Sequence, residues 1–433
     1  MTERDITREV LRLTPKEIAP GTRRAGAWLL GAGALGLGLG FGLGPLHAGW
    51  TALLVATSLV IGLAMVGIVL SAIFQLTGAR WGRAYRRMGE VGVALMPVGL
   101  LGVLGLLAGG SGYLPWLGAH DLEGGKRIWL TRPFWDVRVL FALLAAYTLS
   151  LWFFYYSARR DFCMSGVSKR LKGPLAAWLG KGIGDPRQEA ERCDARLSLL
   201  APIVILGFAG AFSLLGFDLV MALEPDWSST LFGAWFFIGH VFSGLALLAL
   251  VSIVLRPRLG LERYLTDARQ RDLATLLFAF CLLNIDFLWS QYFTYWYANM
   301  PEETGYLVRR IHDAHLPWHG LSWVALLSFF FVPFFALLFR KVKQSGTLLG
   351  AVAVLVVFGI FLARFLEVAP ALLQPSGPSP AGIALPLLAS ALVFLGMLGA
   401  GTFGYGWLLT QLPILPVGDE IFVRHVAGEE PHP

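Results

Sequence analysis

The stretch WTALLVATSLVIGLAMVGIVLSAIF, residues 50–74, decides the fold, because it holds 25 consecutive residues without a charged side chain. An α-helix needs roughly 20 apolar residues to cross the hydrocarbon core of a bilayer. Other segments have the same character, and charged loops separate them. The ten expected spans cover about 25–46, 50–74, 91–109, 134–157, 199–221, 229–255, 273–298, 319–339, 346–368 and 382–410. A membrane β-barrel shows shorter, alternating segments, so the sequence predicts an all-α integral membrane protein with about ten transmembrane helices.

The composition agrees with this class. Of the 433 residues, 56% are hydrophobic and 15% are charged, and the mean hydropathy is +0.64. A soluble domain carries about 25% charged residues, so the composition excludes a free-standing soluble enzyme. We attribute the net charge of +7 to membrane insertion and to contact with anionic lipid headgroups, and expect no nucleic-acid partner.

The basic residues indicate how the chain is oriented. Loops that would share one side of the membrane contain 28 of the 35 Lys and Arg residues, and loops on the other side contain five. Cytoplasmic loops carry the excess of Lys and Arg in membrane proteins. Both termini are therefore predicted to be cytoplasmic.

The same pattern divides the chain into five parts. Residues 158–198 form the longest loop, and Val167–Ile183 within it mixes Lys and Arg with Leu and Trp, which predicts an interfacial helix. The expected parts are a cytoplasmic N-terminal segment (1–24), a first membrane half with spans 1–4 (25–157), the basic cytoplasmic loop (158–198), a second membrane half with spans 5–10 (199–410) and a cytoplasmic tail (411–433).

Cysteine and histidine usage argues against redox centres bound by this chain. Cys163, Cys193 and Cys281 include no CxxC pair, so we expect no iron–sulfur cluster. His240 is the one histidine deep in an expected span, whereas a bis-histidine haem needs two. Neither a metal ligand set nor a catalytic residue is predicted.

Two ionisable residues lie near the middle of neighbouring spans, His240 in the sixth and Asp286 in the seventh. Ser290, Thr294 and Tyr297 fall on the same helical face as Asp286 and lead toward the outer surface. Titratable groups linked by hydroxyls can pass protons, so these five residues form a hypothetical proton path. The alternative is a single buried His–Asp hydrogen bond that holds two helices together.

Further ionisable residues lie near the outer ends of the expected spans, where each must face protein or water. They are Asp136, Arg138, Asp218, Glu224, Arg364 and Glu367. One hypothesis is a polar pocket that opens to the outer face and serves quinol or protons. The other is structural ion pairing, for which Arg364 and Glu367 are suitably spaced on one helix.

Three segments of the chain resemble a known family of membrane subunits. They are IWLTRPFWDVRVLFALLAAY (128–147), FDLVMALEPDWSSTLFGAWFFIGH (217–240) and RDLATLLFAFCLLNIDFLWSQYFTYWYANMPEETGYLVRR (271–310). They are similar to the NrfD or polysulfide-reductase type, and specifically to the second NrfD-like (F-type) subunit of alternative complex III, a quinol:cytochrome c oxidoreductase. Matches to the family motifs are Asp218, Glu224, Pro225, Trp227, Ser229, Thr230, Ser290, Gln291, Trp296, Asn299, Pro301 and Glu302.

The resemblance implies two packed helical bundles plus flanking helices, without a redox cofactor bound by this chain. The implied partners are a sister NrfD-like membrane subunit, an iron–sulfur subunit, multihaem cytochrome c subunits, small membrane anchors and lipid. In the family the sister subunit mainly oxidises the quinol or menaquinol, and the present type supports assembly and proton movement. Asp286 and Arg271 depart from the family pattern, which has an uncharged residue and a histidine in their places.

The leading hypothesis is an integral membrane subunit of a quinol:electron-acceptor oxidoreductase, which supports quinol interaction, assembly and proton translocation and does not itself transfer electrons. The alternatives are a secondary transporter and a purely structural scaffold of the complex. Transporters usually have Gly- or Pro-broken midplane helices, whereas Pro333 is the one deep proline in spans 5–9. Co-purification with haem and iron–sulfur subunits would separate the first and third hypotheses from the second.

Overall fold

The computed structural model describes residues 2–44, 46–118, 124–164, 166–171, 173–373 and 380–428. These residues form helices joined by turns, without a strand. Ten of the helical segments are long and apolar enough to cross a membrane. Within the described residues, the prediction of an all-α membrane protein with ten spans is confirmed.

The spanning segments lie close to the predicted ranges. They are Pro20–Leu43, His47–Thr77, Trp81–Gly118, Arg132–Phe162, Pro186–Leu223, Phe232–Arg258, Asp267–Ala298, Pro317–Leu338, Gly346–Leu372 and Gly382–Gln411. Several are longer than predicted, and the fifth begins at Pro186 rather than near residue 199. Hydropathy marks the part of a helix that crosses lipid, and the helix itself continues into the charged layer.

The helices that build these spans and their connections have the following bounds. The α-helices are α1 Glu3–Leu13, α2 Pro20–Gly38, α3 Leu46–Thr77, α4 Arg86–Glu90, α5 Met96–Gly109, α6 Gly124–Trp129, α7 Arg132–Phe162, α8 Val167–Arg170, α9 Pro174–Gly180, α10 Pro186–Leu219, α11 Phe232–Arg258, α12 Asp267–Ala298, α13 Pro301–Leu307, α14 Pro317–Leu326, α15 Val332–Leu338, α16 Arg340–Gln344, α17 Gly346–Leu372, α18 Pro380–Gln411 and α19 Glu420–Ala427. Short helical turns among the connections include η3 Val91–Leu95, η7 Val308–His312 and η8 Leu327–Phe331.

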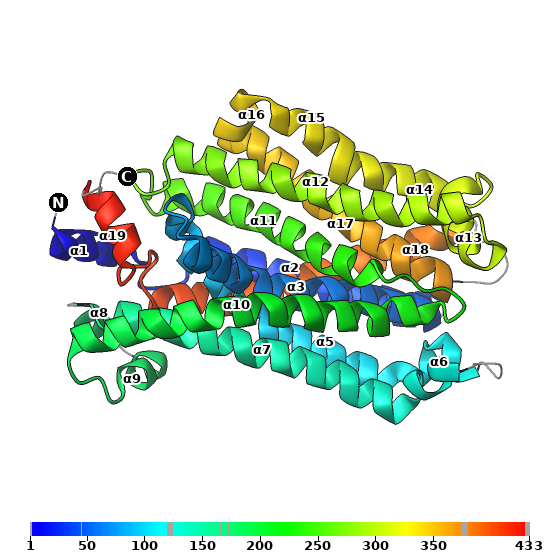
Figure 1. Ribbon diagram of the computed structural model, residues 1–433, viewed down its shortest axis with the longest axis horizontal. Helices are drawn as coiled ribbons and strands as arrows, with labels where there is room; N and C mark the ends of the chain where they lie inside the picture. Colours follow the sequence, from blue (N-terminus) through cyan, green and yellow to red (C-terminus); the bar gives the residue numbers. More distant parts are fainter. Residues whose placement is uncertain are drawn as a thin grey trace.

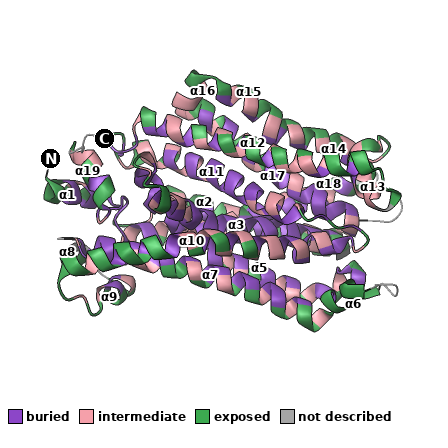
Figure 2. Ribbon diagram, viewed as in Figure 1, coloured by how far each residue is buried: buried purple, intermediate pink, exposed green. Residues whose placement is uncertain are grey.

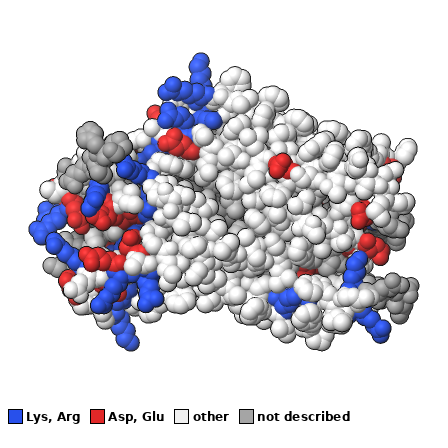
Figure 3. All heavy atoms as spheres, in the orientation of Figure 1, with Lys and Arg blue, Asp and Glu red and all other residues white. Residues whose placement is uncertain are grey.

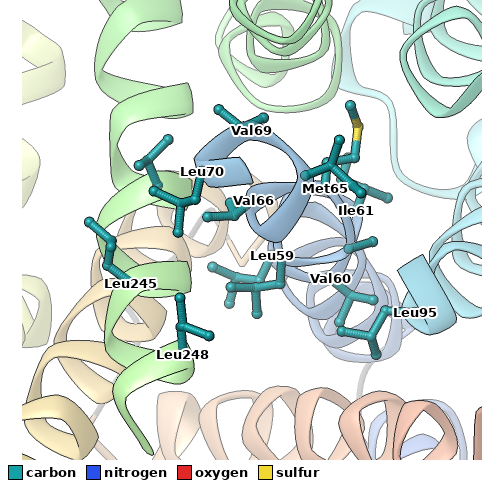
Figure 4. Close-up of a cluster of buried hydrophobic side chains, with 14 of the residues drawn as sticks. Leu59, Val60, Ile61, Met65, Val66, Val69, Leu70, Leu95, Leu245 and Leu248 are labelled. Atoms are coloured by element: carbon teal, nitrogen blue, oxygen red, sulfur yellow. The ribbon is translucent and has the colours of Figure 1, made fainter. Parts of the chain in front are cut away.

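α3 occupies the centre of the molecule. Its sequence is apolar on every side, and such a helix is stable where other helices surround it. It packs against α5, α10, α11, α17 and α18, so that 89% of its spanning window is buried (Figure 2). Figure 4 shows part of this core, in which Leu59, Val66 and Leu70 of α3 lie near Leu245 and Leu248 of α11.

The spans form two bundles and a flanking pair (Figure 1). α3, α5, α7 and α10 form the first bundle, and α11, α12, α14, α15 and α17 form the second. α2 and α18 lie along one another and against α3. α10, which begins within the loop predicted over 158–198, packs against α7 and α3 of the first bundle.

Charged side chains gather at the two ends of the molecule and leave the middle band largely uncharged (Figure 3). Both termini lie at one end, where α1 contacts α19. We call this the terminal end, and the opposite end, with α6 and α13, the distal end (Figure 1). The arrangement is that of a bundle whose long axis crosses the membrane.

The prediction of one interfacial helix over Val167–Ile183 is wrong in extent, because two short helices, α8 and α9, lie there instead. Gly173 separates them with a φ of 137°, a conformation that a side chain disfavours. Pro174 then begins α9, where its fixed φ suits the first turn of a helix. Residue 172, also part of the prediction, lies outside the described residues.

Reporter fusions test the orientation of the chain. α9 and α13 lie at opposite ends (Figure 1), and the basic excess of the terminal end favours a cytoplasmic location. A reporter fused near Lys181 is therefore expected to report the cytoplasm, and one near Glu303 the outside. Fluorescence of a green fluorescent protein fusion reports a cytoplasmic position, and activity of an alkaline phosphatase fusion reports an outside position. Phosphatase activity near Lys181 with fluorescence near Glu303 would contradict the orientation.

Candidate functional site

A cavity of about 140 Å³ lies within the second bundle, toward the distal end. Its walls come mainly from α12, α13, η7, α14 and α17. They are lined by Trp227, Trp235, Leu288, Gln291, Tyr292, Tyr295, Tyr306, Leu307, Arg310, Ile311, Ser322, Trp323, Ala325, Leu326, Phe329, Ala363, Leu366 and Glu367. We call this cavity the aromatic pocket. A mostly apolar cavity with a few polar groups is the usual form of a small-molecule site.

The connections at the distal end shape the wall of the aromatic pocket. Asn299 ends α12 in the left-handed conformation, with a φ of 48°, and the chain then enters α13. Tyr306 of α13 stacks on Trp227, with ring centroids 3.8 Å apart and planes 8° apart. The hydroxyl of Tyr295 donates a hydrogen bond of 2.8 Å to the Ser228 carbonyl oxygen. Rings from three separate segments are thereby held together.

Glu224 anchors these connections through two arginines. The π-helical turn η7 brings Arg309 and Arg310 to the same carboxylate, at N···O distances of 2.6 and 2.5 Å. Arg310 also donates to the Leu366 carbonyl oxygen at 2.9 Å, and its guanidinium lies 3.6 Å from the centroid of the Tyr306 ring. Arg310 therefore joins η7 to α17 while it lines the aromatic pocket.

Arg364 and Glu367 form a buried ion pair on α17, as their spacing indicated. The Arg364 guanidinium lies 3.9 Å from the centroid of the Phe236 ring. Glu367 lines the aromatic pocket, and its backbone carbonyl accepts a hydrogen bond of 3.3 Å from Arg310. Glu224, Arg364 and Glu367 are thus joined through Arg310.

Glu224 and Arg364 do not line the aromatic pocket themselves, and the other three residues of the predicted outer cluster lie apart from it on α7 and α10. Arg138 of α7 and Asp218 of α10 form a buried, bidentate pair with N···O distances of 2.7 and 2.6 Å. The Trp129 indole also donates to this carboxylate, and its ring centroid lies 3.7 Å from the Arg138 guanidinium. Asp136 pairs with Arg132 at the partly exposed surface. A single pocket formed by all six predicted residues is therefore wrong, and the hypothesis of ion pairing describes them better.

The predicted proton path is not formed, because His240 and Asp286 lie apart. The His240 ring is fully buried, and its nitrogens lie 2.8 Å from the Phe236 carbonyl oxygen and 2.6 Å from the Ser58 carbonyl oxygen. Asp286 is exposed. Asn284 is the buried residue that lies against α11, and residues two apart on a helix point about 200° apart. The alternative of a His–Asp hydrogen bond is wrong for the same reason.

The hydroxyl residues of the predicted path share the outward face of α12 with Asp286. The Thr294 hydroxyl donates to the Ser290 carbonyl oxygen at 2.8 Å, and Tyr297 is 79% exposed. The helical period placed these residues on one face correctly. That face points out of the bundle, so the stripe belongs to the outer surface of the protein.

A second buried set of charges, the terminal charge cluster, lies at the terminal end. Its members are Arg83, Arg86, Arg87, Glu90, Arg160, Asp161 and Asp419. Asp419 accepts hydrogen bonds from Arg83 at 2.7 Å and from Arg86 and Arg160 at 2.9 Å. Burial raises the pKa of Asp419, but the guanidinium groups of Arg160, Arg83 and Arg86 outweigh it and hold this pKa well below its usual range.

The low pKa of Asp419 gives the stability of the chain a defined pH dependence. An aspartate in an unfolded chain has a pKa of about 3.9. The stabilisation that ionised Asp419 gives the fold is therefore complete above that pH, and it is lost as the pH falls toward the lower pKa of Asp419 in the folded chain. Between pH 6 and pH 3, wild type is expected to lose more stability than Asp419→Asn. Unfolding in detergent measures this, and identical pH profiles would contradict it.

The sequence pattern alone does not identify ion-pair partners that lie far apart along the chain. It treats Arg309 and Arg310 as markers of orientation and gives no role to Tyr306. The local signals for the terminal charge cluster are the spacings of Arg86 and Arg87 from Glu90, four and three residues. Gln291 and Trp227 line the aromatic pocket, and in the sequence only their match to the family motifs singled them out.

Among the described residues, His, Cys, Asp and Glu side chains do not form a group of three that could hold a metal ion. That this chain has no redox centre of its own stays a prediction. No protein-family model matches the chain, and no curated protein matches it. The resemblance of segments 128–147, 217–240 and 271–310 to the NrfD-like subunits therefore stays a prediction as well.

Proposed function

We propose that this chain is an integral membrane subunit of a quinol:electron-acceptor oxidoreductase of the alternative complex III type, and that the aromatic pocket holds the quinol ring. The chain lies in the bacterial inner membrane with cytoplasmic termini. An iron–sulfur subunit and multihaem cytochrome c subunits accept the electrons, and a sister NrfD-like subunit and small anchors complete the assembly. No proton path is assigned, because His240 of α11 is buried whereas Asp286 of α12 is exposed on the outer surface.

The place of the aromatic pocket is the observation that carries this proposal. Nine of its 18 lining residues come from two of the segments that resemble the family. Segment 217–240 supplies Trp227, and segment 271–310 supplies Gln291 and Arg310. Two separate family-like segments thus meet at one cavity. This favours a ligand that the family shares over a chance similarity between apolar sequences.

The lining suits a flat ring with polar substituents. Aromatic side chains pack well against such a ring. The Trp227 indole nitrogen is buried without a hydrogen-bond partner among the described residues. Burial raises the pKa of Tyr306, so its hydroxyl remains a donor. Gln291 and Glu367 supply oxygens that can accept a hydrogen bond from a quinol hydroxyl.

The size of the pocket limits the ligand. Its volume of about 140 Å³ is below the roughly 300–1,000 Å³ that is typical for drug-sized ligands. The space suits a single head group, and an isoprenoid tail would extend into the surrounding lipid.

A structural scaffold is the second candidate function. The observation that favours it is the ion pairing of all six residues of the predicted outer cluster within the chain. Paired charges stabilise a fold and leave no free group to receive a proton. Ligand binding in the aromatic pocket separates the two functions.

Filling the aromatic pocket tests quinol binding without removal of a polar group. Ala363 of α17 lines the cavity, and Ala363→Leu is expected to weaken the affinity of the purified native complex for a quinol analogue by roughly tenfold or more, because the added carbons occupy the space of the ring. Val354→Leu, on the exposed face of the same helix, is the matched control. Equal affinities in both variants, with the complex intact, would favour the scaffold.

A further inference from the structure

Asp286 lies on an apolar surface of the second bundle. It is exposed on the outward face of α12, beside an open groove of about 700 Å³ between α12 and η8. The other residues that line this groove are Ala279, Leu282, Leu283, Ile285, Trp289 and Phe330. We call it the Asp286 groove. Figure 3 shows that charged side chains are scarce in this middle band of the molecule.

Asp286 has no partner within the described residues, by ion pair or by hydrogen bond. It lies at the middle of the segment Leu273–Ala298, which is otherwise free of charge. The nearest basic residue along α12, Arg271, is 15 residues away, or about 22 Å along the helix axis. This distance is beyond the reach of an arginine side chain.

A carboxylate that faces hydrocarbon is strongly disfavoured, and such residues in membrane spans face protein or water. We infer that a transmembrane helix of a different polypeptide covers the Asp286 groove in the native assembly, and that a Lys or Arg side chain of this helix pairs with Asp286. The occupant is a helix because its backbone must be satisfied in lipid. The small side chain of Ala279 permits the close approach of two helices.

A second copy of this chain does not supply the cation. Its basic residues gather at the two ends (Figure 3). The two that lie within its predicted apolar segments, Arg138 and Arg364, are buried in ion pairs with Asp218 and Glu367. The partner is therefore another membrane protein that carries a basic residue near the middle of a span. Quinol binding in the aromatic pocket plays no part in this contact.

Photo-crosslinking in the native membrane identifies the occupant of the groove. A photoreactive amino acid at Leu282, one turn before Asp286 and 40% exposed, is expected to form a cross-link to one membrane polypeptide. Mass spectrometry is expected to place the cross-link within a span that carries Lys or Arg. The same amino acid at Leu206, 72% exposed on α10, is the control and is expected not to capture that polypeptide.

Charge reversal then tests the ion pair. Asp286→Lys in the full chain is expected to reduce recovery of the cross-linked partner by roughly tenfold or more, because like charges meet, and an aspartate in place of the partner's cation is expected to restore it. Asp272→Lys, at the terminal end of α12, is the matched control and leaves recovery unchanged. The inference is overturned by a Leu282 cross-link to lipid alone or to a second copy, by a partner span without Lys or Arg, or by full recovery with a folded Asp286→Lys chain.

Discussion

Replacement of Asp419 with alanine is expected to lower the free energy of unfolding by about 3–5 kcal/mol. The carboxylate accepts hydrogen bonds from Arg83, Arg86 and Arg160, all of them buried. Its removal leaves these guanidinium groups with too little negative charge in a site that excludes water. It also removes the hydrogen bond of 3.3 Å from the Phe422 amide to the Asp419 carboxylate, which caps α19. The C-terminal helix is therefore expected to detach from the terminal end.

Reversible unfolding of the purified chain in mixed detergent micelles measures this loss. Glu420→Ala is the matched control, because Glu420 is the next residue and its ion pair with Arg424 is exposed. Exposed pairs contribute about 1 kcal/mol or less. If Asp419→Ala were as stable as Glu420→Ala, the terminal charge cluster would not hold the C-terminal helix in place.

Asp218 is the site of the second large effect. Asp218→Ala leaves Arg138 buried against Trp129 without its carboxylate partner, and a loss of about 3–5 kcal/mol is expected. The double replacement Arg138→Met with Asp218→Leu is expected to recover most of this loss, because an apolar pair removes both buried charges. Loss of stability is expected to reduce the amount of assembled complex in the membrane.

The partly exposed pair of Asp136 with Arg132 provides the control for Asp218, since Asp136 lies on the helix that carries Arg138. Asp136→Ala is expected to change stability by about 1 kcal/mol or less. The amount of complex in solubilised membranes and its rate of turnover are both measured. An Asp218→Ala complex that assembles normally but turns over slowly would contradict the structural role. It would instead support a direct role of Asp218 in turnover.

The spans could be predicted from the sequence because a bilayer imposes a length and a polarity on each helix independently of the others. The helical period also placed Asp286, Ser290, Thr294 and Tyr297 on one face of α12. It could not tell which face meets the bundle, because lipid tails are as apolar as a packed helix surface. The proton path failed at this step, since the stripe faces outward and Asn284 lies on the inner face.

Ion pairs were predictable only where both partners lie on one turn of a helix. Arg364 and Glu367 are three residues apart, and the sequence indicated their pair. Asp218 lies 80 residues from Arg138, and only the packing of α7 against α10 brings the two together. The aromatic pocket depends in the same way on Tyr306 reaching Trp227 across separate connections.

Photolabelling of the purified native complex with a photoreactive quinone is the most direct test of quinol binding in the aromatic pocket. Mass spectrometry is expected to find the label on this chain, at the pocket-lining residues of α12, α13 or α14. Excess quinol is expected to prevent labelling, and Ala363→Leu to reduce it while Val354→Leu does not. A complex that lacks quinol oxidation, or a label confined to other subunits, would contradict the proposed function.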